Sequence, residues 1–168
     1  MRAAPLILAL VTAQRLGELA LSRRNTARLM ARGAVEHAPE HYPLIVALHA
    51  AWLGGLWSLA RRRPLRRRWL GAYGLLEALR VWTLASLGPR WTTRIIVLPG
   101  APLVRRGPYR LLPHPNYAVV VGEIAVLPLV FGLARYAAVF SALNAAVLAI
   151  RIRAEARALA PWRDEANV

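Results

Sequence analysis

Residues 117–150 read YAVVVGEIAVLPLVFGLARYAAVFSALNAAVLAI and contain two charged side chains, Glu123 and Arg135. A membrane-spanning helix needs about 20 mostly apolar residues, each rising about 1.5 Å. Arg135 divides this stretch into two apolar runs, at 117–134 and 136–150. The stretch therefore predicts a tight helical hairpin within a membrane.

Three further apolar runs precede this hairpin, at 3–21, 42–60 and 69–87. Hydrophobic residues make up 57% of the 168 residues, which excludes a disordered chain. The sequence has no cysteine, so thiol catalysis, disulfides and thiolate metal sites are excluded. These features predict an all-α integral membrane protein of about five transmembrane helices.

The charge is strongly positive and carried by arginine alone, with 23 basic residues against 8 acidic ones. The arginines separate apolar runs, so we expect the lipid bilayer as a partner and no nucleic acid. Placing 22–41, 88–116 and 151–168 in the cytoplasm puts thirteen arginines there and eight on the other side. The dense cluster at 61–68 favours the opposite orientation. The overall count predicts that segment 88–116 faces the cytoplasm from a cytoplasmic membrane.

Segment 88–116 differs from the rest because it holds six prolines and three glycines, which exclude a long helix. Because the segment also contains the apolar run at 95–98 and aromatic residues, we expect a structured cytoplasmic loop and not a flexible linker. A structured loop of this length is usually functional. Pro113 and Pro115 hold the backbone of His114 extended, and the next helix should start at or just after Pro115. The alternative is a proline-rich stop in which Asn116 caps that helix.

Two blocks in this half of the chain carry a family resemblance. The first is Gly-Pro-Tyr-Arg at 107–110 followed by His-Pro-Asn-Tyr at 114–117, and the second is Arg-Ile-Arg-Ala-Glu-Ala-Arg-Ala-Leu at 151–159. Their order and spacing resemble the isoprenylcysteine carboxyl methyltransferase family and its phospholipid methyltransferase relatives, over about residues 99–160. The chain departs from the family pattern at Pro113, where a basic residue is usual, and at Ala156, where a second Glu is common.

The N-terminal half resembles one small bacterial branch of that family, which is linked to type III polyketide synthases. The residues that carry this resemblance are Gln14, Arg15, Glu18, Asn25, Gly33, Ala34, Glu36, Arg90, Trp91 and Thr92. This branch methylates alkylpyrones or alkylresorcinols, so the resemblance implies a lipophilic acceptor that enters from the bilayer. It implies one integrated domain, with helices 1–3 at 1–87 and a cofactor-binding catalytic region at 88–168.

The family resemblance also implies an S-adenosylmethionine pocket on the cytoplasmic side, formed by Tyr109, His114, Pro115, Tyr117 and Glu155. The residue types agree, because a carboxylate such as Glu155 can bind the ammonium of the cofactor and Arg151 can bind its carboxylate. Ser141, Asn144, Leu148, Arg151 and Glu155 share one helix face. The alternative is an exposed pair of Arg151 and Glu155 beyond the membrane edge.

Glu123 and His114 are the predicted catalytic bases, in that order. A carboxylate two turns into a span is costly unless it is paired or hydrated, and a poorly hydrated carboxylate suits a base for a phenol or enol. The alternative role for Glu123 is a structural partner of Arg80 or Arg15. We predict a substrate-binding role for polar side chains within the spans: Gln14, Glu18, Glu77, Arg80 and Asn144. Glu77 and Arg80 can pair at i,i+3 and lock the bundle instead.

The reaction we predict is methyl transfer to an oxygen of a membrane-dissolved amphiphile, and it requires no metal. Glu36, His37, Glu40 and His41 form a possible metal cluster by residue type, although an ordinary interfacial loop explains them as well. His49 reads as a satisfied histidine of the bundle. The alternative functions are methylation of a prenylcysteine carboxylate or a phospholipid amine, an NADPH-dependent reductase that uses Arg105, Arg106 and Arg110, and an inactive relative. The sequence leaves the oligomeric state open.

Overall fold

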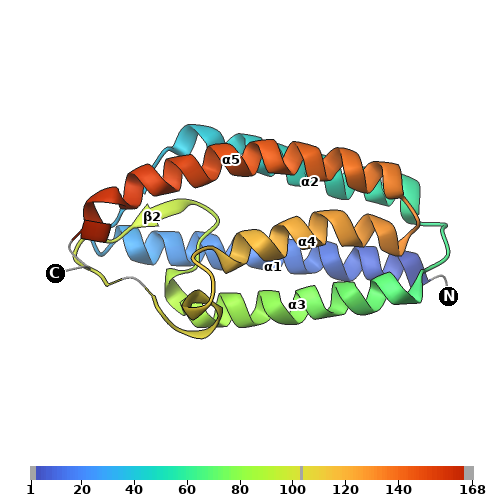
Figure 1. Ribbon diagram of the computed structural model, residues 1–168, viewed down its shortest axis with the longest axis horizontal. Coiled ribbons are helices and arrows are strands. Elements are labelled where there is room, and N and C mark those ends of the chain that lie inside the picture. Colours follow the sequence, from blue (N-terminus) through green and yellow to red (C-terminus); the bar gives the residue numbers. More distant parts are fainter. Residues whose placement is uncertain (1–2, 103, 165–168) are drawn as a thin grey trace.

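A computed structural model describes residues 3–102 and 104–164. Positions 1–2, 103 and 165–168, which belong to the regions predicted at 1–87 and 88–168, lie outside the described residues. Five α-helices run along one elongated bundle, each antiparallel to the next (Figure 1). They are α1 (Ala3–Met30), α2 (Tyr42–Ala60), α3 (Arg67–Leu87), α4 (Pro115–Val130) and α5 (Ala134–Asp164). The predicted all-α fold is confirmed.

The helical hairpin predicted at 117–150 is formed by α4 and α5. Gly132 has a φ of 73° and lies in the short turn between the two helices, so α4 ends at Val130, before the predicted position 134. The last helix continues to Asp164, well past position 150. Arginine, alanine and glutamate dominate after 150, and these strong helix formers extend the helix beyond its apolar part.

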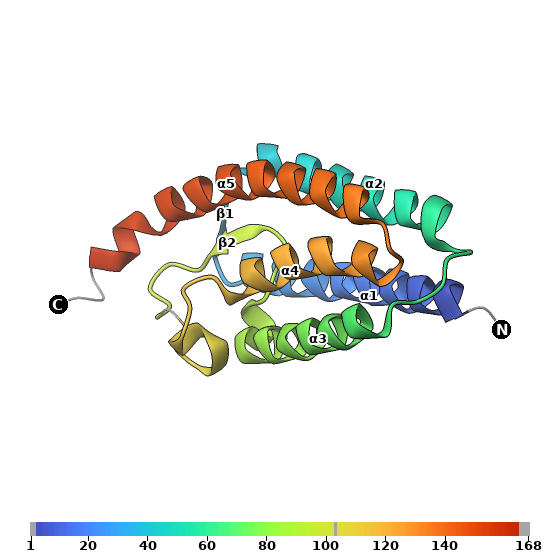
Figure 2. The same ribbon diagram turned by 45° about the vertical axis from the view of Figure 1, so that its right-hand side comes forward.

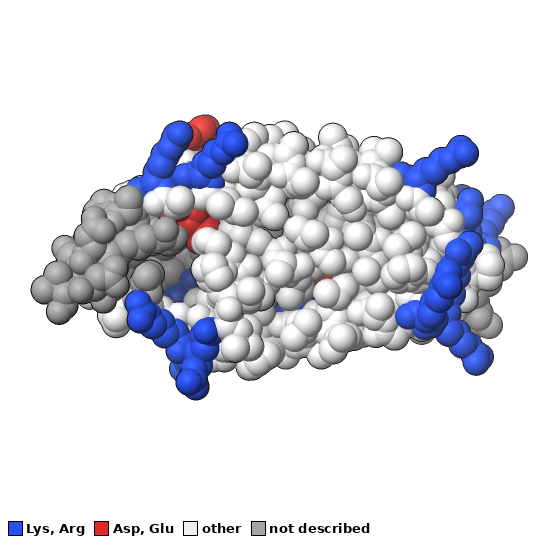
Figure 3. Space-filling model, in the orientation of Figure 1, with Lys and Arg blue, Asp and Glu red and all other residues white. Residues whose placement is uncertain are grey.

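Within the described part of the chain, three helical segments are long and apolar enough to cross a membrane, namely Ala3–Met30, Pro39–Ala60 and Ala134–Ala158. The α4 helix is apolar but has 16 residues, which span about 24 Å and fall short of a hydrocarbon core of about 30 Å. Large apolar side chains such as Leu10 and Val81 are more than 60% exposed. Figure 3 shows arginines gathered at both ends of this face and, between them, a band in which almost all visible atoms are uncharged. This distribution suits a protein that spans a bilayer.

The two ends of the bundle differ in composition. The turn between α4 and α5 and the linker from α2 to α3 lie at one end, whereas segment 88–114 and the last turns of α5 lie at the other (Figure 1). The main apolar core lies toward the first end, where Leu8, Trp52, Leu56, Leu127 and Phe131 pack together and are almost fully buried. The buried polar residues Ser22, Asn25, Thr83 and Ser86 lie in the half of the bundle nearer segment 88–114.

A small sheet at the polar end was not predicted. Strands β1 (Val35–His37) and β2 (Ile95–Val97) pair antiparallel, with Glu36 opposite Ile96. Ile95 and Val97 pack against Ala154 and Ala158 of α5, and Figure 2 shows β1 and β2 lying between α5 and the rest of the bundle. The sheet therefore fixes the first part of segment 88–114 against the C-terminal helix.

Polar side chains on one face of α1 point inward and anchor the same segment. Asn25 is 1% exposed and its side-chain amide donates to the Trp91 carbonyl at 2.8 Å. The Ser22 hydroxyl lies 2.8 Å from the hydroxyl of Thr93, which also lies 3.0 Å from the Tyr42 hydroxyl. Three short 3-10 turns complete the fold: η1 (Pro39–His41), η2 (Gly88–Arg90) and η3 (Gly107–Arg110). Segment 88–114 is thus a structured loop, as predicted.

Candidate functional site

The two sequence blocks that carry the family resemblance meet at the polar end of the bundle. The α4 helix begins at Pro115, as predicted, and places Tyr117 in its first turn beside α5. The Tyr117 hydroxyl donates a short hydrogen bond to the Glu155 carboxylate and accepts one from Arg151 Nε at 2.9 Å. The His114 ring stacks on Tyr117 at 5.2 Å between centroids, with Nδ1 3.7 Å from Glu155 Oε2. We call these four side chains the motif cluster.

Arg151 and Glu155 are therefore connected through Tyr117 and not as an isolated surface pair. His114 caps α4 through its backbone alone, and no side-chain cap bond is formed there. Asn116 does not cap the helix, so this alternative is wrong. Its Oδ1 is buried without a hydrogen-bond partner among the described residues. A buried amide oxygen without a partner is rare and indicates a position for a ligand or a water.

The turn before the motif cluster is held by glycine. Gly107 has a φ of 55°, and a side chain there would overlap Ser86 Oγ and approach Trp82. Arg106 Nε donates to the Ser86 carbonyl at 2.7 Å, which binds the turn to the end of α3. Burial raises the pKa of the next aromatic, Tyr109, and the Glu155 carboxylate adds to the shift. Tyr109 therefore stays protonated at neutral pH and can donate a hydrogen bond near the motif cluster.

A Gly107→Ala variant tests how far this turn supports the site. We expect a loss of stability of more than about 1 kcal/mol, because alanine has the wrong backbone preference and its Cβ meets Ser86. Gly54→Ala is the matched control, since Gly54 is an exposed helical glycine with no atom near its added Cβ. That change should stabilise α2 by about 0.5–1 kcal/mol. Thermal unfolding in detergent measures both, and equal behaviour of the two variants would contradict this role of Gly107.

A cavity of about 310 Å³ lies inside the bundle between the motif cluster and the bundle centre. Tyr117 and Arg151 of the motif cluster border it, as do Asn116 and the buried Asn144. Its other walls are mainly apolar side chains of α1, α2, α4 and α5, namely Leu16, Leu19, Ile45, Val46, Leu53, Val120, Val147 and Leu148. Deeper in the bundle it reaches Arg15, Glu18 and Arg80. It thus joins a polar site to an apolar channel.

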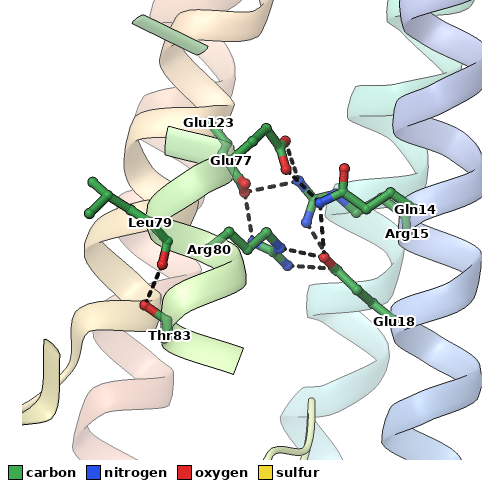
Figure 4. A network of polar contacts seen from close by, with 8 residues as sticks. All are labelled: Gln14, Arg15, Glu18, Glu77, Leu79, Arg80, Thr83 and Glu123. Atoms are coloured by element: carbon green, nitrogen blue, oxygen red, sulfur yellow. Dashed lines mark hydrogen bonds and ion pairs between the residues drawn. The ribbon is translucent and has the colours of Figure 1, made fainter. Parts of the chain in front are cut away.

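A buried polar network closes the inner side of this cavity (Figure 4). Its members come from three helices: Gln14, Arg15, Glu18, Glu77, Arg80 and Glu123. Arg80 binds both oxygens of Glu18, with Nε at 2.5 Å and Nη2 at 2.6 Å, and its Nη1 binds Glu123 at 2.7 Å. Arg15 lies 2.9 Å from Glu18 and 3.0 Å from Glu123. Bidentate pairing of this kind offsets the cost of removing charges from water.

The pairing expected between Glu77 and Arg80 at i,i+3 is wrong. The guanidinium of Arg80 extends across the bundle to α1 and α4, where Glu18 and Glu123 bind it. Glu77 instead accepts a hydrogen bond from Gln14 at 2.5 Å. Glu123 does have the structural partners that the sequence offered as an alternative, because both Arg80 and Arg15 contact it.

The predicted site residues thus fall into three groups. Tyr109, His114, Pro115, Tyr117, Arg151 and Glu155 gather at the junction of η3, α4 and α5. The predicted substrate residues Glu18, Arg80 and Asn144 line the cavity, whereas Gln14, Glu77 and Glu123 are not among its described lining residues. The catalytic, cofactor and substrate roles of all these residues stay predictions.

Two cavity residues were missed as functional candidates. The sequence suggested a helix-capping role for Asn116, as an alternative, and a structural role within the bundle for His49. Both side chains border the cavity. A helical spacing of Tyr42, Ile45, His49 and Leu53 on one face of α2 was the available signal, and all four line this space. The sequence alone could not show whether this helix face lines a cavity or packs against other side chains.

Glu36 is separated from the other three residues of the possible metal cluster. Glu36 faces Arg94 across the sheet, with both of its oxygens 3.0 Å from Arg94 Nη1. His37, Glu40 and His41 border a second cleft of about 510 Å³ between η1 and α5, together with Arg153 and Arg157. Within the described residues no three such side chains are placed to hold a metal ion.

Comparison with known proteins matches the region of the chain that contains the motif cluster. The model of the isoprenylcysteine carboxyl methyltransferase (ICMT) family matches residues 69–161, which include all of its members. The chain belongs to the ICMT family. An uncharacterized protein of Bacillus subtilis (strain 168), YpbQ, is 39% identical over 92% of this chain and 95% of its own length. An uncharacterized protein of Haemophilus influenzae (strain ATCC 51907 / DSM 11121 / KW20 / Rd) is 27% identical over 90% of this chain and 91% of its own length. No solved structure matches the chain.

Membership of the ICMT family confirms the family resemblance found in the sequence, whereas the resemblance to the polyketide-linked branch stays a prediction. The family is one of methyltransferases, and together with the apolar helices it identifies this chain as an integral membrane protein of that class. The matched region begins in α3 and ends in α5, so it includes the network residues Glu77, Arg80 and Glu123 as well as the motif cluster.

Proposed function

We propose that this ICMT-family protein is an S-adenosylmethionine-dependent O-methyltransferase that acts on a lipophilic hydroxyl compound, an alkylresorcinol or alkylpyrone. The observation that carries this proposal is the direct connection of the motif cluster to the apolar cavity through Tyr117 and Arg151. A polar site for a cofactor and an apolar site for an acceptor share these two side chains. The resemblance to the polyketide-linked branch supports the class of acceptor.

The residues of the motif cluster fit the cofactor's charges. Glu155 offers a carboxylate to an ammonium group, Arg151 offers a guanidinium to a carboxylate, and Asn116 Oδ1 is a buried acceptor without a partner. The rings of Tyr109, His114 and Tyr117 provide aromatic faces, which attract a positively charged group. When bound, S-adenosylmethionine supplies a methyl group on a positively charged sulfur. Pro115 holds the turn of backbone that places His114 and Tyr117 together.

The cavity fits an acceptor with a polar head and a hydrocarbon tail. Its apolar walls suit an alkyl chain, while Arg15, Arg80 and Asn144 offer polar groups to oxygens on a ring. Catalysis of methyl transfer rests mainly on holding the two reactants in line at near-attack distance. The rigid network around Arg80 supports that placement, because it fixes the helices on both sides of the cavity.

The competing functions make different demands on the same residues. A prenylcysteine carboxylate is already ionised near neutral pH and needs no base, and a phospholipid amine needs space for a large headgroup. An NADPH reductase needs free arginines for a 2′-phosphate, yet Arg106 is bound to the Ser86 carbonyl. The contact of Arg106 thus counts against the reductase, and the connection of motif cluster and cavity supports methyl transfer to a lipophilic acceptor.

The direct test is transfer of labelled methyl from S-adenosylmethionine by purified protein in bilayers. The acceptors are an alkylresorcinol, an alkylpyrone, a farnesylated cysteine and phosphatidylethanolamine. We expect label on the alkylresorcinol or the alkylpyrone. Label on the cysteine or the phospholipid alone would replace the proposed acceptor, and no label together with no saturable cofactor binding in calorimetry would reject methyl transfer.

A further inference from the structure

His49 lies in the wall of the cavity with a defined tautomer. Its Nδ1 is 2.9 Å from the carbonyl oxygen of Ile45, one turn earlier in α2. A carbonyl can only accept a hydrogen bond, so Nδ1 carries the hydrogen of the neutral ring. The other nitrogen, Nε2, is then left with a free lone pair. None of the described residues forms a hydrogen bond with Nε2. Nε2 is also not one of the fully buried polar atoms that lack a hydrogen-bond partner among these residues.

The other titratable groups of the cavity are occupied. Glu18 accepts from Gln14, Arg15 and Arg80, so its lone pairs are used. The Tyr42 hydroxyl lies 3.0 Å from that of Thr93, and the Tyr117 hydroxyl donates to Glu155. Among the described residues that line the cavity, His49 is therefore the neutral base whose lone pair is left for a ligand.

We propose that His49 Nε2 accepts the proton of the acceptor's hydroxyl group during methyl transfer, an inference that rests on the proposed function. The O–H bond breaks, an N–H bond forms at Nε2, and the electron pair stays on oxygen, which becomes the nucleophile. The resulting imidazolium then releases its proton to water. Imidazole suits this role because its usual pKa is closer to neutral pH than that of other common side chains.

The charged groups around His49 favour loss of the proton from the acceptor, although the same cations oppose a positive charge on the imidazole. The cations facing the cavity come from three other helices, namely Arg15, Arg80 and Arg151, and they stabilise negative charge that develops on the acceptor oxygen. Glu18 is held by two of them. The earlier candidates are less well placed, because Glu123 binds Arg80 and Arg15 outside the cavity lining and His114 faces Glu155. The protein should therefore prefer acceptors that have an acidic hydroxyl group.

A cofactor-free titration tests the proton acceptor without turnover. The probe is an alkylated nitrophenol, whose absorption reports its ionisation, added to protein in detergent below the pH at which the free probe ionises. We expect the bound probe to show the phenolate band with the wild type and His37→Gln, and to lose most of it with His49→Gln. His37 lies in β1 outside this cavity and is the matched control. An equal phenolate band in the His49 variant would overturn the inference.

Kinetics with the natural class of acceptor give the second test. His49→Gln should lower kcat about 100-fold with little change in KM. It should also remove the fall in rate at low pH that protonation of the imidazole causes in the wild type. An acceptor with a more acidic phenol should recover part of the loss, and added imidazole should rescue His49→Ala. An unchanged rate and pH profile in a folded His49→Gln protein would overturn the inference alone, whereas an inactive wild type that still ionises the nitrophenol would count against the proposed function.

Discussion

An Arg80→Met variant is expected to lose about 3–5 kcal/mol of stability, because it leaves buried carboxylates without their main partner. Arg80 is 6% exposed and holds Glu18 through two bonds and Glu123 through a third. Arg15 alone would then face Glu18, Glu123 and the nearby Glu77. Methionine keeps most of the side-chain volume, so loss of charge pairing and not loss of packing dominates the expected effect.

Chemical unfolding of the detergent-solubilised protein measures this loss, and two further variants show its cause. The double variant Arg80→Met/Glu18→Gln should recover part of the stability, since it removes one of the unpaired charges. Arg94→Met breaks the exposed pair with Glu36 and should cost less than about 1 kcal/mol. Equal losses for Arg80→Met and Arg94→Met, or no recovery in the double variant, would show that the network does not hold α1, α3 and α4 together.

The parts of the fold that local sequence controls could be predicted. The bounds of α2 follow from an uninterrupted apolar run, and the α4–α5 hairpin follows from two apolar runs with a short turn. The motif cluster also follows, because the two blocks flank one hairpin and neighbouring antiparallel helices bring their outer ends together. Tyr117 and Glu155 are 38 residues apart, yet a single turn decides that they meet.

The parts that depend on the rotation and packing of whole helices could not be predicted. Arg80 has Glu77 one turn away, but its rotamer and the position of α1 direct it to Glu18. Strands β1 and β2 have three residues each, too few for a recognisable alternation, and their pairing joins segments about 60 residues apart. His49 likewise required the structure, because the same apolar helix face can pack or line a cavity.

A Glu155→Gln variant is expected to weaken binding of S-adenosylmethionine about 100-fold, or by about 3 kcal/mol. Glutamine keeps the shape and can still accept a hydrogen bond from Tyr117, but it cannot offer a negative charge to an ammonium group. Calorimetry with protein in detergent measures the dissociation constant. Glu36→Gln is the matched control, since it removes a carboxylate from the pair with Arg94 at the sheet and should leave cofactor affinity unchanged.

The same variant separates a cofactor ligand from a purely structural link between α4 and α5. If Glu155 serves only to hold Tyr117, Glu155→Gln should keep most of the cofactor affinity, because glutamine still accepts the Tyr117 hydrogen bond, and Tyr117→Phe, which removes this bond, should lose more. If Glu155 binds the ammonium directly, Glu155→Gln should lose affinity well beyond Tyr117→Phe at similar stability. An unchanged cofactor affinity in Glu155→Gln would contradict the cofactor site at the motif cluster, even where methyl transfer itself is observed. The charge of Glu155, more than its hydrogen bond, is therefore the property on which the proposed cofactor site depends.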